Sequence, residues 1–350
     1  MNNKVLVLGA MGNLGANVAV KLKEDGYDVV ACGHRKTDNG FFESKGINYH
    51  SVDICDFDSL KSLPYDHFDV VAHFAGELPS RYKYLPDKLI ESITVGTLNV
   101  LEYMRTKIGC KKIIFPQSPY DLIDYLKEGK PVGADLPRVF PKTGDHAVYA
   151  IAKNAAVDLI EHYHYQYGFS RFVLRFFTIY QYHPNQYHPN PYHPNPYHYR
   201  DHKRYMMPFR GLMEKAMRGE PIEIWGNCKL KKEMVYIKDF TQLVENCVCS
   251  DIEGGIYNVG NGWQVSLEEQ IKGIVDVFSP ADNTSLITYA PDKPDPLCNA
   301  FDISKTIKEL NFKPQYSYID ALKDFKHEMD TEPFALLWGH KEDYHLEDER

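Results

Sequence analysis

The chain has 350 residues, 43% of them hydrophobic, and a formal net charge of −8 at pH 7. This apolar content is enough for a large core in one domain or in two lobes. The acidic balance argues against a general nucleic-acid or anionic-membrane binder, and no apolar run approaches the ~20 residues of a membrane span. Seven cysteines without a CxxC pair are typical of reduced thiols. We therefore expect a soluble cytoplasmic protein without a membrane or nucleic-acid partner.

The first expected strand, Val5–Leu8, runs directly into a glycine-rich turn and then a helix from about Leu14 to Glu24. In a GxxGxxG turn of this kind the first glycine permits a tight bend and the second lets the backbone approach a pyrophosphate. The third lets helix and strand pack closely, and the helix N-terminus faces the phosphates. An ordinary strand-to-helix turn is the alternative. The residues predicted to bind a dinucleotide here are Gly9, Met11, Gly12, Asn13, Leu14 and Gly15.

The end of the second expected strand, Asp28–Cys32, bears on the type of dinucleotide. An acidic residue at this place would hold the ribose hydroxyls of NAD, but the chain has Gly33-His34-Arg35-Lys36. The guanidinium of Arg35 can stack on adenine and pair with a 2′-phosphate, and Lys36 and His34 add positive potential. This favours NADP over NAD, with a solvated basic loop as the alternative.

Two further strand ends complete the predicted cofactor site. A third strand over Asn48–Val52 leads to Asp53 and Ile54, where the carboxylate can accept a hydrogen bond from the adenine amino group or simply face solvent. A fourth strand, Phe68–Phe74, is followed by small residues that leave room for a cofactor, and the predicted contacts are Phe74, Ala75 and Gly76. His73 is interpreted as a packing residue.

The alternation of strands and helices continues with a helix over Ser92–Lys107 and a strand over Lys112–Phe115, which ends just before Ser118. Alternating elements of this kind predict an α/β fold with a doubly wound parallel sheet. In such sheets ligands lie at the carboxyl ends of the strands, which is where Ser118 is expected.

Tyr149 and Lys153 are four residues apart in a predicted helix from His146 to Gly168, so they share one face. A tyrosine normally titrates near ~10 and is a poor base at neutral pH. A neighbouring ammonium favours the phenolate and makes proton transfer possible. The YxxxK pattern alone is weak, because it occurs by chance in a chain rich in Tyr and Lys.

In combination and in this order, the glycine turn, the His73–Gly76 segment, Ser118 and the Tyr149/Lys153 pair resemble an extended short-chain dehydrogenase/reductase. Within that superfamily the chain is similar to the NAD(P)-dependent epimerase/dehydratase family, which acts on nucleotide sugars, over roughly residues 4 to 325. Later segments of the chain resemble the family as well: Val173–Phe177, Pro221–Gly226, Glu233–Asp239, Tyr257–Gly262 and Phe301–Lys305.

The resemblance implies a Ser-Tyr-Lys site. Tyr149 would exchange a proton with a sugar hydroxyl, Ser118 would hydrogen-bond the same oxygen, and Lys153 would hold the nicotinamide ribose. It also implies substrate contacts from Thr178, Lys232 and Lys293, although the family usually has an asparagine and two arginines at these three places.

Family dehydratases carry an acidic pair directly after the serine or threonine, whereas this chain has Pro119 and Tyr120, with Asp121 one step later. A 4,6-dehydratase is therefore not expected. The long interval from Asp121 to Asp145 predicts an inserted helix and loop above the site.

The resemblance implies a Rossmann-type domain over residues 1–177, to which residues 233–250 return, and a smaller α/β substrate lobe over residues 178–325 that contains the strands near Glu223 and Asn258. Helices are expected over Met206–Arg218, over Ser266–Val277 with a capping box from Ser266 to Glu269, and over Asp320–Met329. A homodimer packed through the two helices that contain Ser92–Lys107 and Tyr149 is implied by the resemblance alone.

Residues 182–199 form a repeat of Tyr-His-Pro-Asn units. Its prolines forbid a helix or a central strand, and its five-residue spacing does not bring His183, His188, His193 and His198 to one face of a polyproline helix. We interpret it as an exposed loop rather than a metal site, and no metal ligands are assigned elsewhere. The tail, residues 330–350, is charged, and its Phe334–Trp338 stretch is expected to dock on the body or on a partner.

Three functions follow from these features. The first is a nucleotide-sugar epimerase, and the second is a ketosugar reductase that consumes NADPH. The third, from a different class, is a non-catalytic NADP-binding sensor or scaffold. The complete Ser118, Tyr149 and Lys153 set argues for an enzyme.

Overall fold

The computed structural model describes residues 3–79, 85–128, 130–143, 146–184, 197–200, 203–206, 208–262, 264–295 and 300–344. A sheet of seven parallel strands is the centre of the described chain, in the order β13-β6-β5-β4-β1-β2-β3. Its strands are β1 (Lys4–Leu8), β2 (Asp28–Gly33), β3 (Asn48–Ser51), β4 (Val70–His73), β5 (Lys112–Gln117), β6 (Ser170–Arg175) and β13 (Gly254–Asn258). The predicted α/β fold with a Rossmann-type doubly wound sheet is confirmed.

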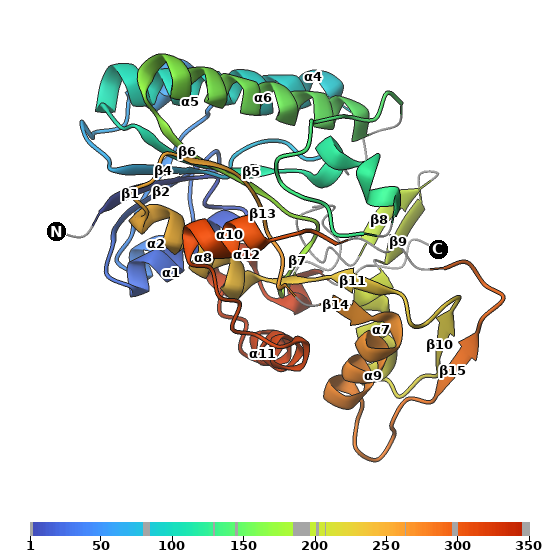
Figure 1. Cartoon of the computed structure of the whole chain (residues 1–350). Coiled ribbons are helices and arrows are strands. Elements are labelled where there is room, and N and C mark those ends of the chain that lie inside the picture. Colours follow the sequence, from blue (N-terminus) through green and yellow to red (C-terminus); the bar gives the residue numbers. More distant parts are fainter. Residues whose placement is uncertain are drawn as a thin grey trace.

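Both faces of the sheet are buried, which follows from the continuous apolar runs in its strands. Val5 and Val7 of β1 pack into one core, while Leu6 and Leu8 pack into a second core on the opposite face. Helices α4, α5 and α6 cover one face, and α1, α2 and α8 cover the other (Figure 1). The first layer of helices is α3 (Phe57–Lys61), α4 (Pro86–Leu89), α5 (Gly96–Tyr103) and α6 (His146–Tyr167). The second is α1 (Asn13–Glu24), α2 (Phe41–Ser44), α8 (Ile237–Cys249) and α10 (Ser304–Leu310).

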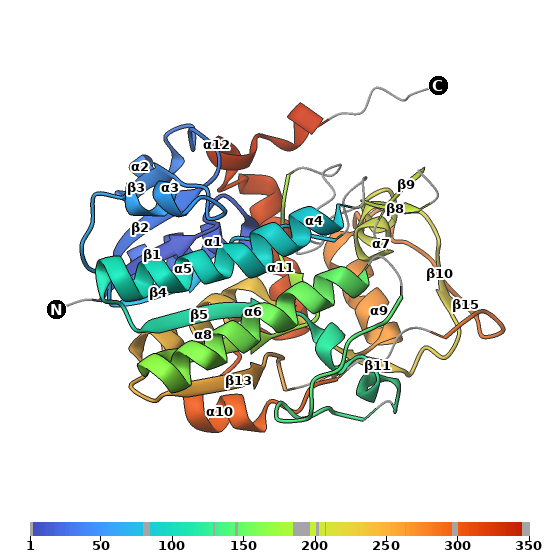
Figure 2. The same cartoon turned by 90° about the horizontal axis from the view of Figure 1, so that it is seen from above.

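The helix predicted over Ser92–Lys107 is part of a longer helical stretch. It begins with α4, passes through a π-helical segment at Ile90–Val95 into α5, and ends with a second π-helical segment at Met104–Ile108. In the view of Figure 2 this stretch and α6 lie side by side above the sheet. Hydrogen bonds join them, such as the one from Thr94 Oγ1 to the Ala152 carbonyl at 3.2 Å.

The smaller lobe is built from short paired strands and helices. β10 (Ile222–Trp225) pairs in parallel with β15 (Ile287–Ala290), and β11 (Lys231–Glu233) pairs antiparallel with β14 (Gln264–Ser266). The remaining elements in this part of the chain are β7 (Ile179–Tyr180), β8 (Tyr197–Arg200), β9 (Lys203–Met206), β12 (Val235–Tyr236), α7 (Pro208–Met217), α9 (Leu267–Phe278) and α11 (Tyr318–Thr331). The capping box from Ser266 to Glu269 is confirmed, and Ser317 and Asp320 form a second one at the start of α11.

Two segments differ from the sequence expectation. The strand near Asn258 was expected in the smaller lobe, but β13 pairs with β6 from Gly254↔Arg171 to Asn258↔Arg175 and forms an edge of the main sheet. The reason is that parallel pairing with β6 buries its apolar side chains. The interval from Asp121 to Asp145 was expected to contain a helix, but its described part has only 3₁₀ turns, at Pro119–Leu122 and Tyr125–Glu128.

The C-terminal tail packs back against the part of the molecule that contains β1 and α2. The short helix α12 (Ala335–Trp338) buries Leu337 and Trp338 in the same core as Val5 and Val7. The expected docking of Phe334–Trp338 is therefore on the body of the protein. No helix in the described ranges is long and apolar enough to cross a membrane.

Candidate functional site

A cavity of about 710 Å³ opens at the carboxyl ends of β1, β2, β3 and β4. β1 lies between β2 and β4, so the chain connections leave the sheet in opposite directions at this point. Ligands of open parallel sheets lie at such switch points, and pockets of ~300–1,000 Å³ are usual for small-molecule sites. Of the predicted cofactor contacts, those that line the cavity are Gly9, Met11, Gly12, Asn13, Leu14, Gly15, His34, Arg35, Asp53, Ile54, Phe74, Ala75 and Gly76.

The glycine loop after β1 has the tight geometry that its spacing predicts. Gly9 has a φ of +80°, and a Cβ built there would lie 2.6 Å from the Ala75 nitrogen. A Cβ on Gly15 would lie 2.3 Å from the Gly9 carbonyl oxygen. Because only glycine fits at both places, the backbone of the loop forms one wall of the cavity.

Asn13 gives an independent indication that the cavity is built for a polar ligand. Its side chain is buried, lines the cavity, and has no hydrogen-bond partner among the described residues for either Oδ1 or Nδ2. A buried amide without partners is costly. It stands at the first residue of α1, where the positive end of the helix favours an anion. The residues present therefore fit the pyrophosphate of a dinucleotide.

The loop after β2 is basic, as predicted, and is held from two sides. Tyr49 Oη donates to the Arg35 carbonyl at 2.6 Å, and Arg35 Nη1 donates to the Leu337 carbonyl at 3.5 Å. His34 and Arg35 line the cavity, whereas Lys36 is exposed and does not. A role for Lys36 stays a prediction.

The Tyr149/Lys153 pair lies behind the strand end of β5. Lys153 Nζ donates to the Pro116 carbonyl at 2.9 Å and lies 4.4 Å from the ring centroid of Phe115 and 5.9 Å from that of Tyr149. Both side chains are buried, and Pro116 itself lines the cavity. Burial lowers the pKa of Lys153 to about 7, because a charged ammonium loses its hydration there.

Ser118 follows β5 and caps the 3₁₀ turn after it. Its Oγ accepts from the Tyr120 backbone N–H at 3.3 Å, and its own N–H donates to Gln117 Oε1 at 2.9 Å. Ser118 is therefore fixed two residues beyond Pro116, the residue that holds Lys153. Ser118, Tyr149 and Lys153 do not line the cavity themselves.

His73 has the packing role that its position predicts. It is fully buried, and its Nε2 pairs with Thr97 Oγ1 at 3.1 Å. Burial, and to a smaller extent the charge of Lys153, lower the pKa of His73 to about 3. A neutral imidazole next to Lys153 adds no competing charge to the site.

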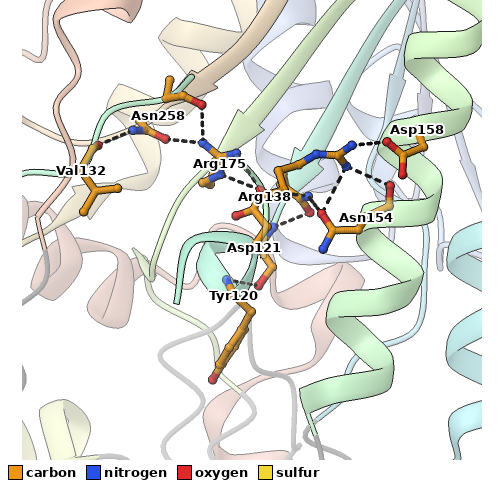
Figure 3. A network of polar contacts seen from close by, with 11 residues as sticks. Tyr120, Asp121, Val132, Arg138, Asn154, Asp158, Arg175 and Asn258 are labelled. Atoms are coloured by element: carbon orange, nitrogen blue, oxygen red, sulfur yellow. Dashed lines mark hydrogen bonds and ion pairs between the residues drawn. The ribbon is translucent and has the colours of Figure 1, made fainter. Parts of the chain in front are cut away.

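A buried polar network ties the segment after Ser118 to the sheet (Figure 3). Arg175 is fully buried, and its Nε and Nη2 donate to Asp121 Oδ2 at 3.0 and 2.6 Å. Its Nη1 donates to the Ala134 carbonyl at 3.2 Å and to Asn258 Oδ1 at 2.8 Å. Burial raises the pKa of Asp121, and the Arg175 charge opposes this rise. Asp121 is thus engaged with Arg175 and serves to hold the inserted segment in place.

The predicted substrate contacts are distributed around the smaller lobe. Thr178 is half-buried between β6 and β7. Lys232 Nζ lies 5.9 Å from the ring centroid of Tyr180, and Lys293 Nζ lies 5.5 Å from that of Trp225. Neither lysine lines the cavity, so their roles in substrate binding stay predictions. The described residues contain no group of His, Cys, Asp and Glu side chains that could hold a metal ion.

Several cavity residues were not identified from the sequence. His183 and Trp338 come from the first repeat unit and from the tail, and their rings lie 4.6 Å apart. The only sequence signal was the apolar stretch 334–338 in an otherwise charged tail. The other cavity residues without a sequence signal are Leu8, Cys32, Gly33, Val52, Cys55, Glu77, Leu78, Lys88, Glu91, Ser92 and Pro116. Of the repeat, residues 185–196 lie outside the described residues, so the interpretation of that part as an exposed loop is not tested.

Known proteins share both the sequence pattern and the fold. The model of the NAD dependent epimerase/dehydratase family matches residues 5–260. The UDP-glucuronate 4-epimerase of Thermodesulfobacterium geofontis is 26% identical over 91% of this chain and 93% of its own length. UDP-glucuronic acid decarboxylase 6 of Arabidopsis thaliana is 23% identical over 92% of this chain and 87% of its own length. The crystal structure of UDP-glucuronic acid 4-epimerase from Bacillus cereus in complex with NAD superposes with a TM-score of 0.67, at 22% identity, over 93% of this chain and 99% of that one.

Proposed function

Because the chain belongs to the NAD dependent epimerase/dehydratase family, we propose that it is an NAD(P)-dependent epimerase or ketoreductase of nucleotide sugars. The observation that carries this proposal is the position of Lys153. Its ammonium is fixed on the carbonyl of Pro116, a residue of the dinucleotide cavity, on the same helix face as Tyr149.

In this proposal each residue has a separate task. A bound dinucleotide supplies the hydride acceptor and donor. Tyr149 takes the proton from the sugar hydroxyl, Ser118 hydrogen-bonds the same oxygen, and the Lys153 ammonium favours the phenolate form of Tyr149. The network of Arg175 and Asp121 keeps the Ser118 turn in place.

Substitution of Tyr149 tests the catalytic part. Tyr149→Phe should lower the turnover of UDP sugars by about two or more orders of magnitude, the scale of acid-base groups, and should leave dinucleotide affinity within about threefold. Tyr165→Phe is the control, because Tyr165 lies on the same helix and is 80% exposed. Turnover by Tyr149→Phe at the wild-type rate would exclude this role. A wild-type protein that binds the dinucleotide but converts no nucleotide sugar would favour the alternative, a non-catalytic NADP-binding sensor or scaffold.

An epimerase and a ketoreductase differ in what they do with the dinucleotide. An epimerase returns the hydride to the substrate and so regenerates its cofactor, whereas a reductase consumes one dinucleotide per turnover. We would denature the purified protein and identify any released nucleotide by mass spectrometry. A stoichiometric dinucleotide supports the epimerase, and an empty protein that oxidises added NADPH with a ketosugar supports the reductase. Binding of neither NAD nor NADP would refute the whole proposal.

We further propose NADP rather than NAD as the preferred cofactor, because Arg35 lines the cavity where a carboxylate would select NAD. A hydrogen bond to a charged group contributes about 1.5–3 kcal/mol, or ~10–100-fold in affinity. Arg35→Ala should therefore weaken NADP binding by at least about tenfold and NAD binding by less than about threefold in titration calorimetry. Equal weakening of both would contradict a phosphate-binding role and favour NAD as the cofactor.

The substrate part of the proposal concerns the smaller lobe. Lys232 and Lys293, with Thr178 and Ser118, are proposed to bind a nucleoside diphosphate sugar, with UDP as the nucleotide because curated relatives carry UDP-sugar names. Substitution of either lysine by Ala should raise the KM for the UDP sugar by about tenfold and change kcat little, since a diphosphate contact contributes equally to ground and transition states. An unchanged KM in both variants would remove these residues from the substrate site.

We also infer that two copies associate through the outer helices. Val95 at the end of the first π-helical segment, Leu98 on α5 and Ile151 on α6 are 42%, 37% and 39% exposed on neighbouring helices. Such an apolar group of side chains is suited to an interface between copies. Light scattering should give the mass of a dimer for the wild type and that of a monomer for Leu98→Glu/Ile151→Glu. A monomeric wild type would refute the inference.

A further inference from the structure

The tail segment, residues 332–338, lies across two of the loops that form the dinucleotide cavity. The indole Nε1 of Trp338 donates to the Met11 carbonyl at 3.1 Å, within the glycine loop after β1. On the loop after β2, Arg35 Nη1 donates to the Leu337 carbonyl at 3.5 Å and Asn39 Nδ2 donates to the Leu336 carbonyl at 3.3 Å. The tail therefore bridges the glycine loop after β1 and the loop after β2.

The aromatic side chains of the tail segment are closely packed. Phe334 stacks on Trp338 with ring centroids 4.5 Å apart, and its ring centroid lies 5.4 Å from that of Phe41 in α2. Trp338 is 5% exposed and is one of the residues that line the cavity.

The start of the Tyr-His-Pro-Asn repeat is joined to the same place. The ring of His183 lies 4.6 Å from that of Trp338 and also lines the cavity. Tyr182 Oη donates to Glu332 Oε1 at 3.2 Å, and Glu332 in turn accepts from the Lys341 backbone N–H at 2.7 Å. Tyr182 and His183 at the start of the repeat are thus joined to the tail segment, and His183 and Trp338 line the cavity together.

We propose that the tail segment is a wall of the dinucleotide site and that Trp338 and His183 contact the bound dinucleotide next to the glycine loop, where they slow its release. This rests on the proposed dinucleotide binding. An indole that only stabilised the fold would need no place in the cavity lining, whereas Trp338 is anchored on the backbone of the glycine loop and lines the same cavity as Asn13, whose side-chain amide has no partner among the described residues. Aromatic faces bind planar or cationic ligand groups well.

Release kinetics test the proposal. The dissociation rate of NADPH, and separately of NADH, would be measured by displacement in a stopped-flow instrument for wild type, Trp338→Ala, Trp338→Phe and Trp225→Phe. Trp225 is the matched control, because it is 51% exposed on β10 and does not line the cavity. Trp338→Ala should release the dinucleotide at least about tenfold faster, and Trp338→Phe about threefold faster because it keeps the ring but loses the hydrogen bond.

Fluorescence gives a second readout that does not depend on the stability of a Trp338 variant. The chain has three tryptophans, so Trp225→Phe/Trp263→Phe leaves Trp338 as the only one. Added NADP⁺ or NAD⁺ should change the emission of this protein. No change in emission at a concentration where calorimetry shows binding would refute the contact.

The outcomes separate this proposal from the one on which it rests. If the wild type binds no dinucleotide in calorimetry, the proposed function fails first. If the wild type binds and Trp338→Ala releases the ligand at the wild-type rate, the tail proposal alone is wrong. Tighter binding by Trp338→Ala would also overturn it, because the tail would then obstruct the site.

Discussion

The buried ion pair between Arg175 and Asp121 permits a quantitative test of how the site is supported. Both side chains are at most 1% exposed, and one carboxylate oxygen accepts two hydrogen bonds from the guanidinium. Asp121→Ala would leave the Arg175 charge buried without its counter-ion. Asp121→Asn would keep an oxygen acceptor and remove only the charge.

The structure sets the size of the expected effect. Loss of one partner of a buried pair costs about 3–5 kcal/mol, and Asp121→Asn should cost about 2 kcal/mol because a charge-assisted hydrogen bond becomes a neutral one. The control is Asp158→Ala. Asp158 pairs with Arg138 in the same network but is 65% exposed, so its loss should cost less than about 1 kcal/mol.

Urea unfolding measures these differences. With a slope of about 3 kcal/mol per molar urea, Asp121→Ala should lower the midpoint by about 1–1.7 M, and Asp158→Ala by less than about 0.3 M. In the double variant Asp121→Ala/Arg175→Met the loss should be smaller than the sum of the single losses, since no charge remains buried.

A catalytic role for Asp121 would give the opposite pattern. If Asp121 acted as a catalytic carboxylate, Asp121→Asn would lose two or more orders of magnitude in kcat on the proposed UDP-sugar reaction with an unchanged urea midpoint. We expect a lower midpoint and a kcat within about fivefold of wild type.

Three further outcomes are expected. Lys153→Met should abolish turnover yet raise the free energy of unfolding at pH 6, because burial lowers the pKa of Lys153 to about 7. The buried wild-type lysine is neutral above pH 7, and removing its proton costs less free energy as the pH approaches 10. The gain should therefore shrink as the pH rises from 7 towards 10. A gain independent of pH in urea titrations would contradict this. Burial raises the pKa of Glu328 to about 7, so this group makes the folded state less stable as the pH rises from about 4.5 to 7. At pH 8 the Glu328→Gln variant should therefore have a free energy of unfolding about 3 kcal/mol higher than that of the wild type. Equal free energies of unfolding at pH 8 would speak against this. Gly15→Ala should weaken dinucleotide binding at least about tenfold in calorimetry, because its Cβ would lie 2.3 Å from the Gly9 carbonyl oxygen, whereas Gly133→Ala, with no atom within 4 Å of the new Cβ, should bind as wild type.

Much of the fold could be predicted because local patterns dictate it. Apolar runs such as Val5–Leu8 are short and continuous, which suits strands buried on both faces. The end of β1 and the start of α1 are marked by glycines whose backbone no other residue can adopt without a clash. The capping box at Ser266 is equally local, since its partners are three residues apart.

The partners of β13 and of the inserted segment could not be predicted in the same way. Asn258 pairs its strand with β6, and its side chain accepts from Arg175, 83 residues earlier in the chain. Arg175 itself would be an unexpected residue inside a sheet, and its burial depends on a counter-ion, Asp121, and on acceptors at Ala134 and Asn258 that are all distant in the chain.

The sequence by itself therefore determined the doubly wound sheet, the glycine loop and the proximity of Tyr149 to Lys153, because each depends on residues that are close in the chain. Only the tertiary structure decided that Lys153 is buried against Pro116 and that Trp338 returns to the Met11 carbonyl, 327 residues away. Such contacts leave no periodic pattern in the sequence. They form where the packing of whole elements brings a side-chain donor next to a backbone carbonyl that is distant in the chain.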